Sequence, residues 1–447
     1  MSSIVRKFDI AILGAGVVGL NLAFWISELY DYSVILIDKE PGVGFHQSMR
    51  NTGGVHRPVF VDANSRSGKW MEKSYELWRI LAQNFNLPFN VIGRITLAID
   101  EEDAFMIERA NKWAVANGLS SDEIEFVTGN EVRKFEPNVS CVVGVVAKKE
   151  AVTSYGQMCE QLLRLCEENG VIFAKGIRVE NIKETLDGIE LDLREVTSNI
   201  QFQLKSSFAI NATGGAALKL AKKLGMGNGY VDLHLRGAYY RVEGSVVDSI
   251  KRQVYPLTRH GIEGIDVSYT GPHLVTRMDG MGGWRKELGP TAAPVLGPYA
   301  YRGLSDSFSD GFAKIFDDVN SPMLKMLANR EFLSFAWNQW KMVRSKDNVV
   351  NYLKKCIPEL TKEMIVGEGY AGILVEYMNE KGFVSEPVSL FGNFVLHILY
   401  TGAGATGSPA YAAHLLQELG TREILTQSRA KRFPKHNSMW SIDSVLS

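Results

Sequence analysis

The sequence predicts a mixed α/β and α+β fold, in which a discontinuous Rossmann-like nucleotide-binding domain carries an inserted substrate domain. Three observations lead to this prediction. A strand, a glycine turn and a helix open the chain at residues 9–30, and a buried strand runs into glycines at 207–215. A strand, a glycine loop and a helix close it at 392–420. Because strand patterns dominate the middle of the chain, the inserted domain is expected on a mixed, largely antiparallel sheet.

Composition narrows the class of protein. The 447 residues have a formal net charge of −1, so no basic face for nucleic acid is expected. The four cysteines form no metal-type CxxC pair, which predicts no metal site and a reduced, cytoplasmic protein. No apolar run reaches the length of about 18 residues that a membrane span needs.

The first glycine turn is the most specific motif. Residues 14–19, GAGVVG, match GxGxxG between the strand Asp9–Leu13 and a helix. Gly14 permits the tight turn, Gly16 lets the backbone approach a pyrophosphate, and Gly19 lets helix and strand pack closely. The helix N-terminus then offers free N–H groups to phosphates. Asp38 ends the next strand, where its carboxylate can accept a hydrogen bond from a ribose hydroxyl.

The remaining elements are predicted from their periodicities. A helix is expected at 64–85, where the aromatic stripe from Trp70 to Trp78 belongs to the core. Helices at 101–117 and 153–170 each end at a glycine that suits a C-cap. Another helical segment follows Ser305 and extends to Leu353. Strands are expected at 93–100, 171–184, 190–196, 239–244, 252–257 and 272–280.

A polar loop, HQSMRNTGGVH at residues 46–56, follows the second strand. A simple nicotinamide domain would continue here into its next crossover, so this loop favours a longer flavin cofactor. Ser48, Arg50, Asn51 and Thr52 supply donors and acceptors. The glycine pair 53–54 would let backbone N–H groups approach the edge of an isoalloxazine ring.

From these motifs onward the sequence is similar to the D-amino-acid-oxidase-like superfamily of FAD-dependent amine and 2-hydroxyacid oxidoreductases. It most resembles the L-2-hydroxyglutarate dehydrogenase/oxidase branch, with the glycerol-3-phosphate dehydrogenases as neighbours. The supporting segments are HQSMRNTGGVH, LPFNVIGRITLAIDEED, EVRKFEPNV, INATGG, RGAYYRV, VYP, GPHLVTRMDG, LGPTA and IPEL…VGEGYAGILVE, in that order up to about residue 415.

The resemblance implies an FAD fold of this superfamily and assigns cofactor contacts. Val179 would bracket an adenine, and the late glycine loop would face the flavin. The full expected set is Gly14, Gly16, Val17, Val18, Gly19, Asp38, Lys39, Ser48, Arg50, Asn51, Thr52, Val179, Ala212, Thr213, Gly214, Gly402, Gly404, Ala405, Thr406 and Gly407. The expected domain boundaries are 1–90, 151–225 and 366–428 for the FAD-binding domain, 91–150 and 226–365 for the substrate domain, and 429–447 for a basic tail.

Two departures from the branch leave the substrate open. Leu374 stands where the branch usually has an arginine that could read a carboxylate. Residues 401–407, TGAGATG, replace an NAPSPAAT-like loop. The new loop is still glycine-rich and precedes a helix, whose N–H groups could stabilise negative charge on a reduced flavin.

The expected chemistry is loss of a hydroxyl proton and of a hydride from the same CH–OH group. A histidine base suits near-neutral pH, and His56 and His273 are the candidates. A structural role in the loop or sheet is the alternative for each. A small anionic substrate would need a bidentate cation. The candidates for substrate binding are Arg57, Arg236, Tyr239, Tyr255, Thr276 and Arg277. For Arg236 and Arg277 the alternative is a salt bridge at the surface or at the interface between the lobes.

Three functions remain in competition. The first is oxidation of a small L-2-hydroxyacid, and the second is oxidation of glycerol-3-phosphate on the same scaffold. The third is a flavin-binding module without catalysis. Quinone and oxygen are both open as electron acceptors. Cations between Arg429 and Lys435, followed by Met439 and Trp440, could contact an anionic membrane or an anchor protein, although a solvated tail is the simpler expectation.

Overall fold

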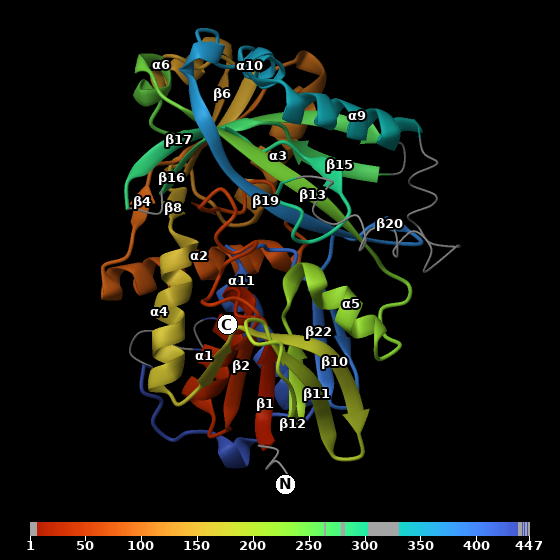
Figure 1. Ribbon diagram of the computed structural model, residues 1–447. Helices are drawn as coiled ribbons and strands as arrows, with labels where there is room; N and C mark the ends of the chain where they lie inside the picture. The colour runs from red at the N-terminus through yellow and green to blue at the C-terminus, as the bar shows by residue number, and fades with distance from the viewer. Residues whose placement is uncertain are drawn as a thin grey trace.

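The first sheet is largely parallel and forms the lower lobe in Figure 1. The computed structural model describes residues 7–262, 265–278, 282–302 and 330–436, with Trp440, Ile442 and Val445. The parallel strands run in the order β22-β12-β1-β2-β9. Their bounds are β1 Lys7–Leu13, β2 Val34–Asp38, β9 Ile172–Lys175, β12 Gln201–Asn211 and β22 Val395–Tyr400. The strands β1, β2 and β22 and the second half of β12 are mostly apolar and buried, because parallel strands at the centre of a sheet are covered on both faces.

Antiparallel strands extend this sheet at one side. The meander of β10 (Ile177–Thr185) and β11 (Gly188–Glu195) pairs with the first half of β12. The strand β21 (Val388–Phe391) pairs with β22. The sheet is therefore assembled from three segments that are far apart in the chain, as the predicted discontinuous fold requires.

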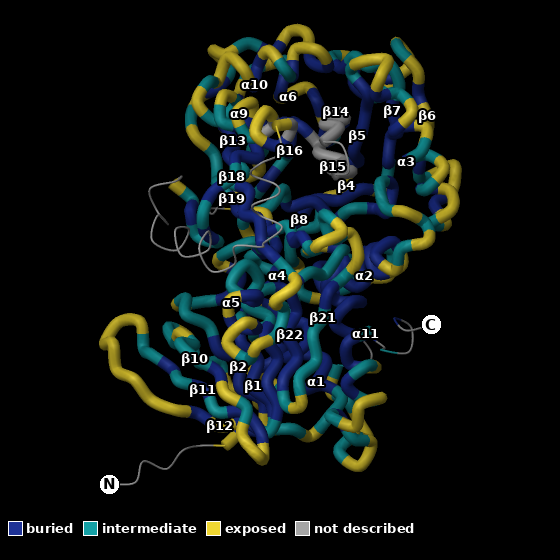
Figure 2. Tube along the Cα trace, turned by 90° about the vertical axis from the view of Figure 1, so that its right-hand side faces the viewer, coloured by how far each residue is buried: buried dark blue, intermediate teal, exposed yellow. Residues whose placement is uncertain are grey.

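Four helices pack beside this sheet. They are α1 (Val17–Leu29), α2 (Arg66–Phe85), α4 (Tyr155–Glu168) and α11 (Ser408–Thr421). Nearly every residue of α1 is buried, because the helix packs against α4 and α11 as well as the sheet. Figure 2 shows the dark, buried centre that β1, β2, β22 and α1 form. A short helix, α5 (Ala217–Lys222), follows β12.

The second sheet forms the upper lobe and is mixed. Its order is β20-β19-β13-β17-β16-β14-β5-β7-β6, with β15 beside β14 and β18 beside β13, and only β5 and β14 pair in parallel. The bounds are β5 Arg94–Ala98, β6 Ile124–Thr128, β7 Val143–Ala147, β13 Val231–Val242, β14 Gln253–Ile262, β15 Ile265–Thr270, β16 His273–Met278, β17 Trp284–Gly289, β18 Ala293–Val295, β19 Ile365–Asn379 and β20 Gly382–Phe383. The helices are α3 Ala104–Ala116, α6 Ser245–Ser249, α9 Arg330–Arg344 and α10 Lys346–Leu353.

A small three-stranded sheet joins the lobes. Its strands are β3 (Gly54–Val55), β8 (Ala151–Thr153) and β4 (Phe89–Val91), in the order β3-β8-β4. The strand β3 lies within the C-terminal end of the polar loop, and β8 leads into α4. This sheet therefore connects the polar loop to the start of the upper lobe.

The predicted fold class is confirmed, whereas several elements differ from the prediction, among them the strands β6, β7 and β17. Of the helix expected after Ser305, the described part forms α9 and α10, and residues 303–329 lie outside the described chain. The long strand β19 was not predicted because its glycines weaken a strand pattern. One of them, Gly372, touches the polar loop so closely that a Cβ there would overlap the carbonyl oxygen of Arg50.

Parts of the tail are docked on the lower lobe, which differs from the expectation of a fully solvated segment. Arg429 bonds both carboxylate oxygens of Asp9 at 3.0 and 3.1 Å. Nδ1 of His436 lies 2.9 Å from the buried carboxylate of Glu28. Trp440 is only 2% exposed, packs on Trp25 and donates to a backbone carbonyl of α2. Trp440 is therefore part of the core, while Met439 lies outside the described residues. No helix in the described ranges is long and apolar enough to cross a bilayer.

Truncating Trp440 to alanine should therefore destabilise the lower lobe by about 3 to 5 kcal/mol, the usual cost for a buried tryptophan. Thermal unfolding of the FAD-loaded protein measures the effect. Phe433→Ala is the matched control in the same tail, because that side chain is 82% exposed. Equal melting temperatures for the two variants would contradict the docked tail.

Candidate active site

The glycine turn between β1 and α1 can only be built from glycines. Gly14 has φ +102°, and a Cβ there would lie 2.5 Å from the carbonyl oxygen of Ala212. A Cβ on Gly19 would overlap the backbone of Gly14. The first turn of α1, which includes Val17 and Val18, holds no acidic residue. Its positive end is thus available to a phosphate group.

Polar side chains brace this turn. Asp38 accepts the Ala15 N–H at 2.7 Å and the Glu40 N–H at 2.9 Å. The buried hydroxyl of Ser48 accepts the Val17 N–H at 3.0 Å. The acid at the end of β2 and the polar loop therefore meet at the N-terminus of α1, where the sequence expects a dinucleotide.

The polar loop uses several of its own side chains to hold its shape. Asn51 accepts the Gly53 N–H at 2.8 Å and donates to the carbonyl of Ser48 at 2.8 Å. The Thr52 hydroxyl accepts the Gly54 N–H at 3.3 Å. Part of the polarity that makes this loop conspicuous thus serves the loop backbone, and the backbone of the glycine pair is held in position.

The other end of the loop contacts β19 and the region after β18. Arg50 donates to the carbonyl of Ala371 at 3.2 Å and lies over the ring of Tyr301. Lys39 pairs with Glu40 and lies over the ring of Tyr299. Both cations expected at the cofactor therefore contact the seam between the lobes.

The late glycine loop lies beside the polar loop. The His56 N–H donates to the Thr406 hydroxyl at 3.2 Å, and the indole of Trp78 donates to the Thr406 carbonyl at 2.9 Å. Gly402 and Gly404 have positive φ, and Ala405 and Gly407 lead into α11, whose first turn holds no acidic residue. Two helix N-termini, those of α1 and α11, thus stand in the same lobe on either side of the polar loop.

The remaining expected cofactor residues follow β12 and line β10. Ala212 donates its N–H to Leu13 at 2.8 Å, and Thr213 donates to Asn211 at 2.7 Å. Gly214 has φ +58° and faces Gln47 of the polar loop. Val179 is partly buried in the core shared by β1, β2 and the meander. The structure therefore gathers the expected cofactor residues along one edge of the parallel sheet.

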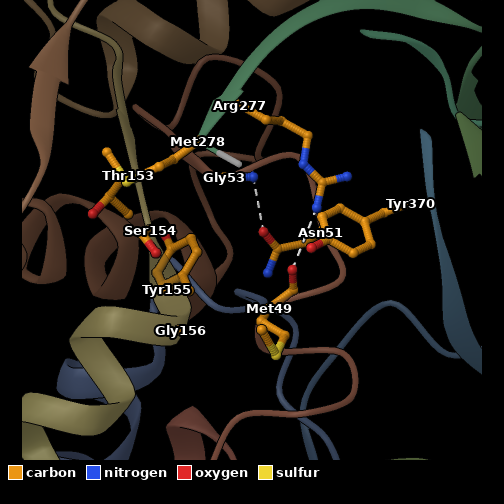
Figure 3. A pocket seen from close by; sticks show the side chains of 10 residues that line it. All are labelled: Met49, Asn51, Gly53, Thr153, Ser154, Tyr155, Gly156, Arg277, Met278 and Tyr370. Atoms are coloured by element: carbon orange, nitrogen blue, oxygen red, sulfur yellow. Dashed lines mark hydrogen bonds between the residues drawn. The ribbon is translucent and has the colours of Figure 1, made fainter. Parts of the chain in front are cut away.

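A pocket of about 70 Å³ opens where the polar loop meets the upper lobe (Figure 3). Arg277 is the only charged side chain among its lining residues. It lies over the rings of Tyr239 and Tyr370 at 5.1 Å each and donates to the carbonyl of Met49. The lining residues are Met49, Asn51, Gly53, Thr153, Ser154, Tyr155, Gly156, Arg277, Met278 and Tyr370.

Arg277 shares a buried carboxylate with a second arginine. Glu287 is fully buried and lies 3.2 Å from Arg277 and 2.8 Å from Arg285. Two guanidinium groups against one carboxylate leave a net positive charge at the pocket wall. The site can therefore attract an anion while Arg277 stays fixed in orientation.

His56 lies between the polar loop and the upper lobe. Its Nδ1 is 2.8 Å from the carboxylate of Glu150 and 3.0 Å from Arg94. Its ring meets the edge of Tyr255 at 6.2 Å. Among the described residues, no hydrogen-bond partner is found for its Nε2, and the side chain is 24% exposed. His56 thus keeps one ring nitrogen for another group.

His273 differs sharply from His56. It stacks on Tyr255 at 3.8 Å, and its Nδ1 donates to the Gly271 carbonyl at 2.9 Å. Burial lowers the pKa of His273 to about 3. Burial also raises the pKa of Tyr255 and of Tyr239, so both phenols stay protonated. A histidine with so low a pKa is a weak proton acceptor.

Two expected substrate arginines have other partners in the structure. Arg57 is buried against Glu72 and Glu123, at 2.9 Å from each. Arg236 donates to the carbonyl of Tyr301. Neither lines the pocket. Thr276 alternates with Arg277 on β16, and its buried hydroxyl has no partner among the described residues.

Sequence reasoning missed Glu150, Arg94 and Tyr370. Arg94 lies within a predicted strand and Glu150 shortly before a predicted helix, but nothing in the sequence pairs two charges 56 residues apart. Tyr370 lies on β19, the strand that was not predicted. One signal in the sequence could have identified Glu150. It directly precedes the short apolar run from Ala151, so burial was to be expected, and a buried charge requires a partner.

Comparison with known proteins places the chain in a family and a fold. Residues 9–419 match the sequence profile of a family described as FAD dependent oxidoreductase. The chain is 23% identical over 304 residues to an L-2-hydroxyglutarate dehydrogenase of Escherichia coli O17:K52:H18, which covers 68% of each chain. It is 22% identical to the mitochondrial L-2-hydroxyglutarate dehydrogenase of Homo sapiens, over 94% of this chain and 90% of the relative.

The fold is shared with solved structures. The L-alpha-glycerophosphate oxidase of Mycoplasma pneumoniae, solved with FAD bound, superimposes with a TM-score of 0.65. It is 19% identical, and the match covers 93% of this chain and 95% of that chain. The residues present fit an FAD molecule at the carboxyl ends of the parallel strands. The turn Gly14–Gly19 leaves room for a phosphate group, the first turn of α1 holds no acidic residue, and the polar loop offers its backbone.

Proposed function

The chain belongs to the family of FAD-dependent oxidoreductases, and on this premise we propose that it oxidises a small L-2-hydroxyacid of the L-2-hydroxyglutarate type to the 2-oxoacid. The relatives named L-2-hydroxyglutarate dehydrogenase support this substrate class at 21–23% identity. When bound, FAD supplies the acceptor for the hydride that leaves the hydroxyl-bearing carbon. Residues of the chain bind the substrate and accept its hydroxyl proton.

The observation that carries the proposal is the position of His56. The residue ends the polar loop, its backbone is bonded to the late glycine loop, and its ring faces the upper lobe. A base here would stand between the cofactor residues and the pocket. His56 takes the hydroxyl proton at its free Nε2, whereas the low pKa of His273 makes that residue an unsuitable base.

Arg277 holds the substrate carboxylate in this proposal. A guanidinium fixed by Glu287 and stacked on two tyrosines is already oriented for a bidentate contact. The low volume of the pocket favours a small substrate. Tyr239 and Thr276 remain in the proposal as hydroxyl groups. The ring of Tyr239 lies 5.1 Å from the Arg277 guanidinium, and the buried Thr276 hydroxyl has no partner among the described residues.

Arg277→Met should raise the substrate dissociation constant by about 100-fold, in line with the loss of a charge-assisted pair. The visible spectrum of bound FAD should stay the same. Arg285→Met is the matched control, because it removes the other partner of Glu287 without touching the pocket. Equal losses in the two variants would show that the charge balance of Glu287, and not substrate binding, is responsible.

Oxidation of glycerol-3-phosphate is the second candidate function. Leu374 is 51% exposed on β19 where the resembling branch has an arginine, so one cation for a second carboxylate is missing. Dye-coupled turnover with a substrate panel separates the candidates. L-2-hydroxyglutarate should give the highest kcat/KM, and its D-enantiomer none. Preference for glycerol-3-phosphate would favour the second candidate, and no turnover with either would favour a flavin-binding module.

The electron acceptor is a separate part of the proposal. A quinone or oxygen would reoxidise the reduced flavin, and the exposed cations of the tail, such as Arg432, could bring the protein to an anionic membrane surface. Comparing reoxidation by air and by a soluble quinone analogue, in single mixing experiments, identifies the acceptor.

A further inference from the structure

We propose that Glu150 is a positioning residue for the reaction, which holds His56 in the tautomer with its proton on Nδ1 and leaves Nε2 free as the base. This inference rests on the proposed function of His56. It assigns a role to a buried carboxylate that lies outside every motif discussed so far. Its basis is the geometry of three side chains from three separate segments.

The carboxylate of Glu150 is rigidly held. Its side chain is 2% exposed, and Oε1 accepts the Arg57 N–H at 3.1 Å and lies 2.9 Å from Nη2 of Arg94. The Glu150 backbone carbonyl accepts the N–H groups of Ile92 and Gly93 at 3.1 and 2.9 Å. Only Oε2 remains, and it lies 2.8 Å from Nδ1 of His56. A carboxylate fixed on every other side can define the orientation of the imidazole ring.

The tautomer follows from donor and acceptor chemistry. A carboxylate only accepts, so the contact at 2.8 Å requires a proton on Nδ1 of His56. Arg94 only donates, and its Nη1 at 3.0 Å from the same nitrogen favours the opposite tautomer. Because Arg94 already bonds Oε1 through Nη2, the charge-assisted bond to Glu150 decides the proton position.

Glu150 remains ionised in this environment. Burial alone would raise its pKa, but the charges of Arg94 and His56 and the bond from His56 hold the pKa below its ordinary value. The groups that face His56 are Glu150, Arg94 from β5, Tyr255 from β14 and His273 from β16, with Arg57 adjacent in the chain. Arg94 offsets part of the attraction, and Glu150 is the only carboxylate bonded to the ring.

The proton balance of the step is simple. The substrate O–H bond breaks, its proton moves to Nε2 of His56, and the ring becomes an imidazolium with protons on both nitrogens. FAD, when bound, would accept the hydride from the hydroxyl-bearing carbon of the substrate. The negative charge of Glu150 stabilises the imidazolium, which is the arrangement by which a third group assists a histidine base.

The alternative is that Glu150 only neutralises Arg94. Glu150→Gln distinguishes the two roles, because it keeps the size of the side chain, removes the charge and replaces one accepting oxygen with a donating N–H2 group. The FAD-loaded protein is labelled with ¹⁵N-histidine, and the His56 signals are assigned by their loss in His56→Asn. In Glu150→Gln, the ring should titrate at least about one pH unit lower than in the wild type. The share of the Nε2–H tautomer should rise.

Flavin reduction provides a second readout. Glu150→Gln should slow it about 10- to 100-fold at neutral pH, with the acid limb of the pH profile moved by the same amount as the ring titration. Glu150→Asp should recover part of the rate. In a His56→Asn background, Glu150→Gln should change the rate less than about 2-fold, because its effect passes through His56.

The outcomes separate this inference from its premise. Unchanged ring signals in Glu150→Gln, or an equal loss of rate in the His56→Asn background, would overturn the positioning role. Flavin reduction by His56→Asn at the wild-type rate would overturn the proposed function of His56, and the inference with it. If Glu150→Gln does not fold, the same ring titration in Glu150→Asp decides, since a shortened carboxylate should still shift the tautomer ratio.

Discussion

Gly14→Val should lower the affinity for FAD by at least about 100-fold, or about 2.8 kcal/mol. Valine has to adopt φ +102°, and its Cβ would lie 2.5 Å from the carbonyl oxygen of Ala212. Both effects move the start of α1 away from the phosphate position. FAD titration followed by visible absorbance measures the loss, and the upper lobe should remain folded because it does not contact this turn.

Gly118→Val is the matched control for backbone strain. Gly118 has φ +92°, and nothing lies within 4 Å of a Cβ built on it. It should cost stability without loss of bound FAD. Retention of full flavin absorbance by Gly14→Val would mean that the GxGxxG turn does not hold the cofactor.

His56→Ala should slow reduction of the bound flavin by about 10²- to 10⁴-fold, the usual contribution of a general base. FAD content should be unchanged, since the Thr406 contact is made by the His56 backbone. Stopped-flow bleaching of the flavin under anaerobic conditions isolates this step from reoxidation. His56→Asn adds a useful comparison, because its amide can still donate to Glu150 while it cannot accept the proton.

His414→Gln is the control for the loss of a histidine elsewhere. That residue lies on α11 and pairs with Glu418, away from the pocket. It should reduce its flavin at the wild-type rate. If His56→Ala does the same, the base is another group and the proposed mechanism is wrong.

The sequence predicts the start of the lower lobe well because the interactions that determine this part are between residues close together in the chain. The GxGxxG turn, the apolar run of β1 and the acid at Asp38 are fixed by neighbours within one βαβ unit. The strand β19 depends instead on contacts with a distant segment, since its glycines are needed for the approach of Arg50. A single-sequence pattern reads such glycines as strand breakers.

For the candidate site, the sequence identifies residues that belong to recognisable motifs and misses those that only the fold brings to them. His56 and Arg277 belong to quoted motifs, and both lie at the seam between the lobes. Arg57 is one residue from His56 in sequence, yet its side chain turns to Glu72 and Glu123. Glu150 reaches His56 through the three-stranded sheet, a pairing that no local pattern encodes.

The number of cations in the tail does not by itself predict what the tail contacts. Four cations suggested a surface for an anionic partner, but Arg429 and His436 bond to acids of the lower lobe, and Trp440 enters its core. The acids, Asp9 and Glu28, lie more than 400 residues away, so only the folded chain brings them together.

The central claim is that this flavoenzyme removes hydrogen from carbon 2 of an L-2-hydroxyacid. It is tested most directly by mixing the FAD-loaded protein, without oxygen, with L-2-hydroxyglutarate carrying hydrogen or deuterium at that carbon. The account predicts bleaching of the flavin with one 2-oxoacid formed per FAD, and slower bleaching with deuterium. A flavin band that persists at saturating substrate, with no 2-oxoacid formed, would contradict it.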